Sequence, residues 1–165
     1  MGRFKIIYFL FLFISVAFHS AWAGSLIPSL TGAIYPQLKK TDLASLGLGK
    51  PLVLSFFSVT CYPCRLEAPV LNELSQDYEK KGVRFIYVNL DDTNLRKRIP
   101  AYLKLTKVPF LVFLPSVDQV YERFLVTGLP YLIVYDAQGN EVYRHAGFDP
   151  DLKQSLTDTL KKLAP

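Results

Sequence analysis

The stretch FFSVTCYPCRLEAP, residues 56–69, contains both cysteines of the chain, Cys61 and Cys64, three positions apart. They follow an apolar run, residues 52–59, that is typical of a buried strand. After them, residues 62–81 carry apolar side chains at helical spacing and are followed by a glycine. The sequence therefore predicts a CxxC motif at the junction of a strand and a helix.

Such a junction favours thiol chemistry, because Cys61 would start the helix, where free N–H groups and the positive end of the helix dipole stabilise a thiolate. A thiol with a pKa of about 8.5 is only about 3% ionised at pH 7, whereas one with a pKa of about 7 is half ionised. Cys64 would lie one turn further on, close enough to attack a mixed disulfide at Cys61. Pro63 stiffens the loop at a position where its missing N–H does no harm. These positions predict a redox pair.

Other uses of two cysteines fit the sequence less well. A c-type haem site needs histidine after Cys64, where Arg65 stands. A structural zinc site needs four ligands, and the chain after residue 23 offers two thiols and one histidine, His145. A purely structural disulfide would close too small a loop to stabilise the fold much. A copper chaperone using Cys61, Cys64 and His145 remains as an alternative, although an ordinary strand histidine is the simpler interpretation of His145.

Apolar runs alternate with helix-like segments along the rest of the chain. Strands are expected at residues 83–90, 110–114, 131–135 and 141–144, and helices at residues 93–105, 116–126 and 149–163. The turn residues 136–140 join the last two strands into a hairpin. Residues 25–50 suggest only a lead-in strand or loop. This order predicts an α/β protein with a mixed sheet covered by helices.

The N-terminus has the pattern of an export signal. A basic end precedes an apolar stretch, residues 6–18, and then the small-x-small sequence Ala21-Trp22-Ala23. Residues 1–23 are expected to be a signal peptide, cleaved before Gly24, although the apolar stretch extended to Ala23 approaches the roughly 20 residues of an uncleaved membrane anchor. Residues 24–165 then form one domain.

The charge pattern argues against a nucleic-acid partner. The chain has a formal net charge of +5, and its basic residues are dispersed apart from Arg96-Lys97-Arg98. Such a short run is typical of a solvated helix face, and no recognition motif or aromatic platform accompanies it.

Two segments resemble thioredoxin-fold proteins. PLVLSFFSVTCYPCRLEAPVLNEL, residues 51–74, is similar to their active-site segment, and VTGLPYLIVYDAQGNEVYRHAGF, residues 126–148, to their later proline, hairpin and glycine segment. An additional strand and helix at about residues 108–126 resembles the TlpA and ResA type of extracytoplasmic thiol-disulfide oxidoreductase. The resemblance implies a thioredoxin-like fold, with a central mixed β-sheet flanked by helices and an inserted strand-helix unit before a cis-proline.

The resemblance also implies roles for single residues. Cys61 matches the exposed attacking cysteine, and Cys64 matches the buried resolving cysteine. Pro69 matches the proline inside the active-site helix. Pro130 matches the cis-proline that faces the CxxC motif.

Glu67 lies three residues after Cys64 on the same helical face. Spacing alone leaves a solvated surface residue and an active-site residue equally open. ResA-type proteins carry an active-site glutamate here, which implies a role in proton handling. Ser55 stands where thioredoxins have a buried aspartate, so Glu67 is the nearest available carboxylate. Two residues depart from the family pattern: Thr60 before the first cysteine, which bears on the shape of the substrate-docking surface, and Tyr62 after it, which is unusual for this branch.

These observations predict an extracytoplasmic thiol-disulfide oxidoreductase of the bacterial periplasm that reduces disulfides of exported proteins. Neither Tyr62 nor Pro63 is cationic, which favours a reductant over a strong oxidant. The resemblance implies apocytochrome c as one substrate and a membrane thiol carrier as the electron source, with no bound cofactor or metal. A disulfide oxidase or isomerase remains the alternative within the same class.

Overall fold

The computed structural model describes residues 26–164. The predicted signal peptide or anchor, residues 1–23, lies outside the described residues, as does the expected cleavage site before Gly24. Within the described part, no helix is both long enough and apolar enough to cross a membrane.

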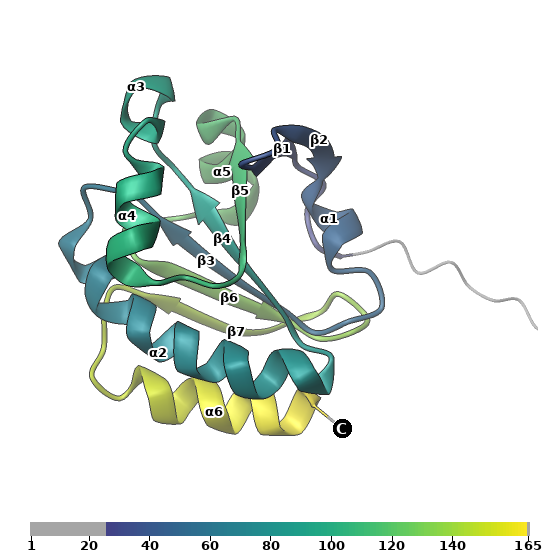
Figure 1. The fold of residues 1–165 in the computed structure, drawn as a ribbon. Coiled ribbons are helices and arrows are strands. Elements are labelled where there is room, and N and C mark those ends of the chain that lie inside the picture. Colours follow the sequence, from purple (N-terminus) through teal and green to yellow (C-terminus); the bar gives the residue numbers. More distant parts are fainter. Residues whose placement is uncertain (1–25, 165) are drawn as a thin grey trace, which may run out of the picture.

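The described chain folds around a seven-stranded mixed sheet with helices on both faces (Figure 1). The strands are β1 (Thr31–Tyr35), β2 (Lys39–Asp42), β3 (Leu52–Phe57), β4 (Arg84–Asn89), β5 (Leu111–Pro115), β6 (Tyr131–Tyr135) and β7 (Glu141–Ala146). The helices are α1 (Leu43–Leu46), α2 (Tyr62–Tyr78), α3 (Thr93–Arg96), α4 (Ile99–Thr106), α5 (Val117–Phe124) and α6 (Leu152–Leu163), with a 3-10 turn, η1 (Glu79–Lys81), directly after α2.

The order of the strands across the sheet is β2-β1-β5-β4-β3-β6-β7. β4 pairs in parallel with β3 and with β5, and the other neighbours are antiparallel. The predicted mixed sheet covered by helices is therefore confirmed. The additional strand and helix before Pro130 are β5 and α5, and β5 connects the central strands to the hairpin of β1 and β2.

The central strands are buried on both sides, which is why they form continuous apolar runs in the sequence. In β3, Val53 and Phe57 pack on the face covered by α2, α4 and α6, whereas Leu54 and Phe56 pack on the face covered by α1 and α5. Successive side chains of a strand point to opposite faces of the sheet. Ser55 falls on the α2 side of this alternation and is the polar exception within β3.

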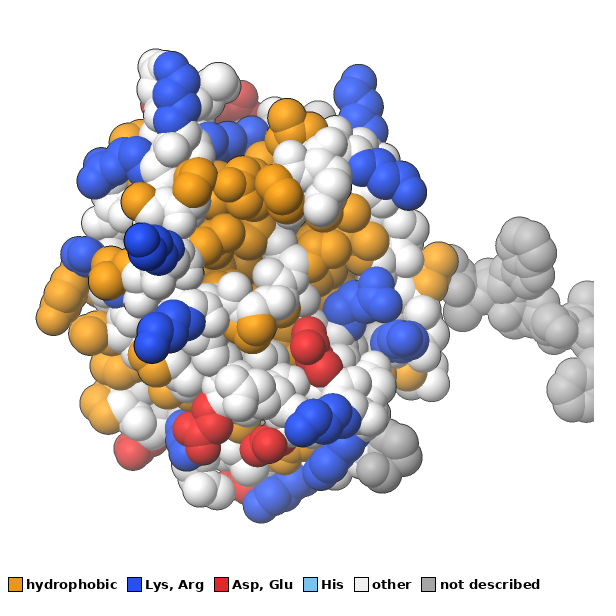
Figure 2. Space-filling view, in the orientation of Figure 1, with side chains coloured by type: hydrophobic (Ala, Val, Ile, Leu, Met, Phe, Trp, Pro, Cys, Tyr) orange, Lys and Arg blue, Asp and Glu red, His pale blue; other side chains and the backbone are white. Residues whose placement is uncertain are grey.

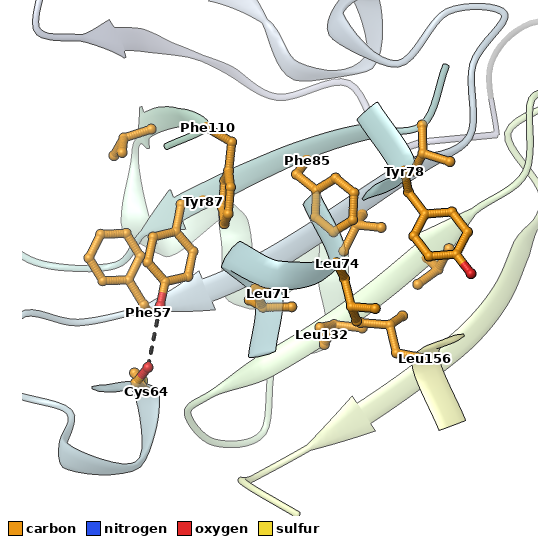
Figure 3. Close-up of a cluster of buried hydrophobic side chains, with 14 of the residues drawn as sticks. Phe57, Cys64, Leu71, Leu74, Tyr78, Phe85, Tyr87, Phe110, Leu132 and Leu156 are labelled. Atoms are coloured by element: carbon orange, nitrogen blue, oxygen red, sulfur yellow. Dashed lines mark hydrogen bonds between the residues drawn. The ribbon is translucent and has the colours of Figure 1, made fainter. Parts of the chain in front are cut away.

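Helices α2 and α6 lie side by side on one face of the sheet (Figure 1). Leu71, Leu74 and Tyr78 of α2 meet Leu156 of α6 and the strand side chains in one cluster (Figure 3). Burying such side chains contributes about 1.5 to 3 kcal/mol each. This contact holds α2, which carries the cysteines, firmly against the sheet.

Two segments differ from expectation. The single helix expected at residues 93–105 is divided into α3 and α4, because Pro100 in the first turn of α4 has no N–H with which to continue the hydrogen bonds of α3. The lead-in expected at residues 25–50 contains the β1–β2 hairpin and α1. Its strands are short and half-exposed, so they lack the apolar run that marks a buried strand.

Candidate active site

The two cysteines form a disulfide at the N-terminus of α2. Cys61 is the N-cap residue, and its sulfur accepts a hydrogen bond from the backbone N–H of Cys64 at 3.1 Å. Cys64 is fully buried, whereas Cys61 is partly exposed. The first turn of α2 contains no acidic residue, so the partial positive charge of the helix end is not offset there. The arrangement lets an incoming sulfur reach Cys61 and shields Cys64.

A buried carboxylate, Asp91, organises the loop before Cys61. Its Oδ1 accepts a hydrogen bond from the Ser58 hydroxyl at 2.5 Å, and its Oδ2 accepts from the Val59 N–H at 2.9 Å. The Asn89 side-chain amide donates to the same Oδ2 at 2.6 Å. The Ser58 carbonyl in turn accepts from the Cys61 N–H at 3.1 Å. Asp91 therefore ties the end of β4 to the loop that presents Cys61.

The sequence pattern gives Asp91 no place in the site. One feature of the sequence could have indicated its role. Asp91 directly follows a strand predicted to be buried, and a buried carboxylate needs hydrogen-bond partners. Which partners it finds depends on the pairing of β3 with β4, since Ser58 and Asp91 are 33 residues apart.

Glu67 is fully buried on α2, three residues after Cys64. Its Oε1 accepts a hydrogen bond from the Ser55 hydroxyl at 2.7 Å, and its Oε2 has no hydrogen-bond partner among the described residues. Burial raises the pKa of the Glu67 carboxyl from 4.5 to about 7, and the hydrogen bond from Ser55 offsets part of that rise. The solvated-surface interpretation is therefore wrong. A carboxyl group with this pKa is partly protonated and partly ionised near neutral pH.

Aromatic side chains fill the space beside Cys64. The Tyr87 hydroxyl donates a hydrogen bond to the Cys64 carbonyl at 3.4 Å, drawn as a dashed line in Figure 3. Phe57 stacks on Tyr87 with ring centroids 4.0 Å apart, and the hydroxyls of Tyr87 and Tyr102 lie 3.3 Å apart. Burial raises the pKa of Tyr87, and raises that of Tyr102 to about 12, so both hydroxyls stay protonated at neutral pH. The Cys64 carbonyl thus meets a neutral hydroxyl, beside a cluster of stacked aromatic rings.

Pro130 follows a cis peptide bond from Leu129, as the resemblance implies. It directly precedes β6, in which Tyr131 pairs with Phe56 near the end of β3. Pro130 therefore lies at the same end of the strands as the loop that leads from β3 to the cysteines. Its carbonyl accepts a hydrogen bond from the Gly147 N–H at 2.8 Å. A second cis bond, between Tyr35 and Pro36, has no signal in the sequence pattern.

His145 lies on β7, opposite Leu132 of β6. Among residues 26–164 no group of three or more His, Cys, Asp or Glu side chains is placed to hold a metal ion. His145 therefore does not join the two cysteines in a ligand set, and the copper-chaperone alternative loses its third ligand. The ring of His145 stacks instead beside Tyr143, with centroids 6.4 Å apart.

Comparison with known proteins agrees with this geometry. A family model described as thioredoxin-like matches residues 49–141. The thiol-disulfide oxidoreductase ResA of a Bacillus cereus strain is 30% identical over 127 residues, which cover 77% of this chain and 70% of that protein. ResA of Bacillus thuringiensis subsp. konkukian is 29% identical over 117 residues, which cover 71% of this chain. This chain spans 65% of the length of that ResA protein, just under two thirds.

Solved structures show the same fold. A candidate thiol:disulfide interchange protein DsbE from Chlorobium tepidum superposes with a TM-score of 0.74 at 25% identity, covering 85% of this chain and 96% of that one. A thioredoxin-like protein from Porphyromonas gingivalis gives a TM-score of 0.71 at 24% identity, with 84% and 91% coverage. The match of the family model to more than half of the chain and the identity to ResA lead to one conclusion. The chain belongs to the thioredoxin-like family, among its ResA-type thiol-disulfide oxidoreductases.

Proposed function

We propose that this protein is a thiol-disulfide oxidoreductase that reduces disulfides of other proteins outside the cytoplasm. The observation that carries the proposal is the disulfide between a partly exposed Cys61 and a buried Cys64 at the N-terminus of α2. A helix N-terminus lowers the pKa of a thiol in its first turn and so supplies the attacking thiolate.

The reaction begins with the reduced pair. The Cys61 thiolate attacks one sulfur of a substrate disulfide, which breaks and releases a substrate thiolate that takes up a proton. Cys64 then gives up its proton and attacks the Cys61 sulfur of the mixed disulfide, which releases the second substrate thiolate. Two electrons pass to the substrate, and the protein ends in the Cys61–Cys64 disulfide. An external dithiol returns it to the reduced form and becomes a disulfide itself.

Glu67 is proposed to handle the Cys64 proton. The two residues are three apart on α2, so their side chains lie on one face of the helix. A carboxyl with a pKa of about 7 is present in both protonation states at neutral pH. It therefore accepts a proton when Cys64 becomes the nucleophile and returns one when the disulfide is reopened.

Substrates and location belong to the same proposal. Residues 1–23 direct export or remain as a tether, and residues 24–165 form the thioredoxin-like domain in the bacterial periplasm. The substrates are exported proteins with disulfides, with the cysteines of apocytochrome c as one candidate, and a membrane thiol carrier supplies the electrons. The names of the ResA and DsbE relatives support the chemistry, and the export pattern of the N-terminus supports the location.

The roles of the cysteines are tested by trapping. Cys61→Ser is expected to abolish reduction of a protein disulfide, whereas Cys64→Ser is expected to accumulate a mixed disulfide through Cys61, because the resolving thiol is missing. Mass spectrometry of the trapped species identifies the linked cysteine. Mixed disulfides that accumulate through Cys64 in the Cys61→Ser variant would reverse the assignment.

The direction of electron flow is tested by the reduction potential. The uncharged Tyr62 and Pro63 predict a value nearer to that of thioredoxin, about −270 mV, than to that of DsbA, about −120 mV. Equilibration of the protein with thiol redox buffers measures it. A value at the oxidising end would make the protein an oxidase.

A further inference from the structure

A groove of about 380 Å³ runs beside the disulfide, between the first turns of α2 and the end of α4. Tyr62, Arg65 and Pro69 form one wall, and Leu105 and Lys107 form the other. A smaller hollow of about 140 Å³ shares Arg65 and Leu105 with it and continues toward Arg98. Because they share these side chains, the two hollows are neighbours, and together they are here called the α2–α4 groove.

The groove is lined by residues that flank both cysteines in the chain. Tyr62 directly follows Cys61, Arg65 directly follows Cys64, and Val59 lines the smaller hollow. The Asn72 side chain donates a hydrogen bond to the Thr106 carbonyl at 2.7 Å, which links α2 to the end of α4. A polypeptide joined to Cys61 through its own sulfur therefore meets a preformed surface.

The charge of the groove has one sign. Arg65, Arg98 and Lys107 are exposed on its walls, and neither hollow is lined by an acidic side chain. Among the described residues none of these three cations takes part in an ion pair, whereas the ion pairs of Arg144, Lys153 and Lys161 lie on other elements. Along the left edge of Figure 2, over α4 and the start of α2, basic side chains alternate with hydrophobic ones. Unpaired charges of one sign attract an oppositely charged partner.

Two apolar side chains complete the surface. Tyr62 is 61% exposed and Leu105 is 65% exposed, on opposite walls of the groove. The Arg65 guanidinium lies over the Tyr62 ring, 5.2 Å from its centre. Exposed aromatic and arginine side chains of this kind commonly anchor a bound chain. The groove thus offers apolar contacts between positive charges.

We propose that the α2–α4 groove docks the polypeptide next to the reacting cysteines of the substrate, and that it selects substrates with acidic side chains there. This rests on the proposed function, since the groove matters only if Cys61 exchanges with a protein disulfide. Docking of this kind speeds exchange in either direction. The selectivity is therefore independent of whether the protein acts as a reductase or an oxidase.

Two peptides of equal length, each with one internal disulfide, test the selectivity. One carries Asp and Glu beside its cysteines, and the other carries Lys at the same places. The acidic peptide is expected to exchange about tenfold faster at low ionic strength. This advantage is expected to shrink as NaCl is raised, because salt screens exposed charges.

The triple variant Arg65→Gln, Arg98→Gln, Lys107→Gln is expected to lose the preference. A matched variant, Lys39→Gln, Lys40→Gln, Lys50→Gln, removes the same charge from β2 and from the segment before β3, away from the groove, and is expected to keep it. Each peptide rate is divided by the rate with hydroxyethyl disulfide, which is small and neutral. This division removes any effect of Arg65 on the reactivity of Cys61.

The outcomes separate the two proposals. Equal rates for the two peptides, together with rapid exchange with hydroxyethyl disulfide, would overturn the docking proposal alone. An equal loss of preference in both triple variants would also overturn it, because the preference for the acidic peptide would then depend on the net charge of the protein and not on the groove. No exchange with any disulfide would overturn the proposed function.

Discussion

The carboxyl group of Glu67 is buried and accepts one hydrogen bond, from Ser55 of β3. Moving a carboxylate out of water disfavours its charged form, and one hydroxyl donor compensates only in part. The pKa of about 7 follows from this balance. In the unfolded chain the same group has its ordinary pKa of 4.5. Between these two pH values, Glu67 therefore takes up a proton when the chain folds.

This difference predicts a pH-dependent stability. Because the folded pKa is raised, the stabilising contribution of protonated Glu67 is fully present below pH 4.5 and is lost as the pH rises through about 7. The loss is on the order of 3 kcal/mol. Chemical unfolding of the oxidised protein at pH 5 and pH 8 measures it. Glu67→Gln is expected to flatten the dependence and to slow disulfide exchange near neutral pH.

Glu122→Gln on α5 is the matched control, since it changes the same atoms at an exposed position. It is expected to leave both the pH dependence of stability and the exchange rate as in the wild type. If Glu67→Gln behaved like Glu122→Gln in both measurements between pH 5 and 9, Glu67 would have no part in proton transfer.

At the scale of elements, the β1–β2 hairpin depends on a strand far along the chain. β1 pairs with β5 of the inserted unit, and Gly32 faces Pro115 in that register. A Cβ built on Gly32 would lie 2.4 Å from Cζ of Phe113 and 2.7 Å from the Leu114 carbonyl oxygen. The close approach of the two strands therefore requires glycine at this position.

Gly32→Ala is expected to lower the free energy of unfolding by about 1 to 3 kcal/mol, because the added methyl group must displace Phe113 or the β5 backbone. Gly128→Ala is the control, since a Cβ there meets no atom within 4 Å. Denaturant unfolding of both variants measures the difference. An unchanged free energy of unfolding for Gly32→Ala would show that β1 does not need this close approach to β5.

At the scale of the whole molecule, the site residues lie together at one end of the inner strands β3, β4 and β6. The cysteine loop leaves the end of β3, Asp91 follows the end of the parallel strand β4, and Pro130 precedes the antiparallel strand β6. The N-terminus of the chain carries the export pattern, residues 1–23. The proposed function requires this domain to act outside the cytoplasm.

Expression of the full chain in a bacterium is expected to yield a periplasmic protein whose mass corresponds to a start at Gly24, because Ala21-Trp22-Ala23 has the small-x-small form of a cleavage site. Ala23→Arg is expected to leave the precursor uncut. Mass spectrometry of the periplasmic and membrane fractions checks both. Full-length wild-type protein in the membrane would indicate a tether, and full-length protein in the cytosol would contradict export.

The strands around β3, the active-site helix and the closing hairpin were predictable from the sequence. Each depends on neighbours in the chain: a continuous apolar run, a helical spacing of apolar residues, or turn residues between two strands. Cys61 and Cys64 were predictable for the same reason, since both belong to the start of α2. The hairpin of β1 and β2 was missed because its half-exposed strands are held by β5, about 80 residues later.

The sequence by itself determined the chemistry available to this protein: two thiols at the start of a helix, followed by a carboxylate on the same face. Only the tertiary structure decided how that chemistry is tuned. Glu67 meets Ser55 across 12 positions and Asp91 meets Ser58 across 33, because the packing of α2 on β3 and the pairing of β3 with β4 bring them together. Burial, the pKa of a carboxyl group and the charge of a groove all depend on side chains that are distant in sequence, so no local pattern could predict them.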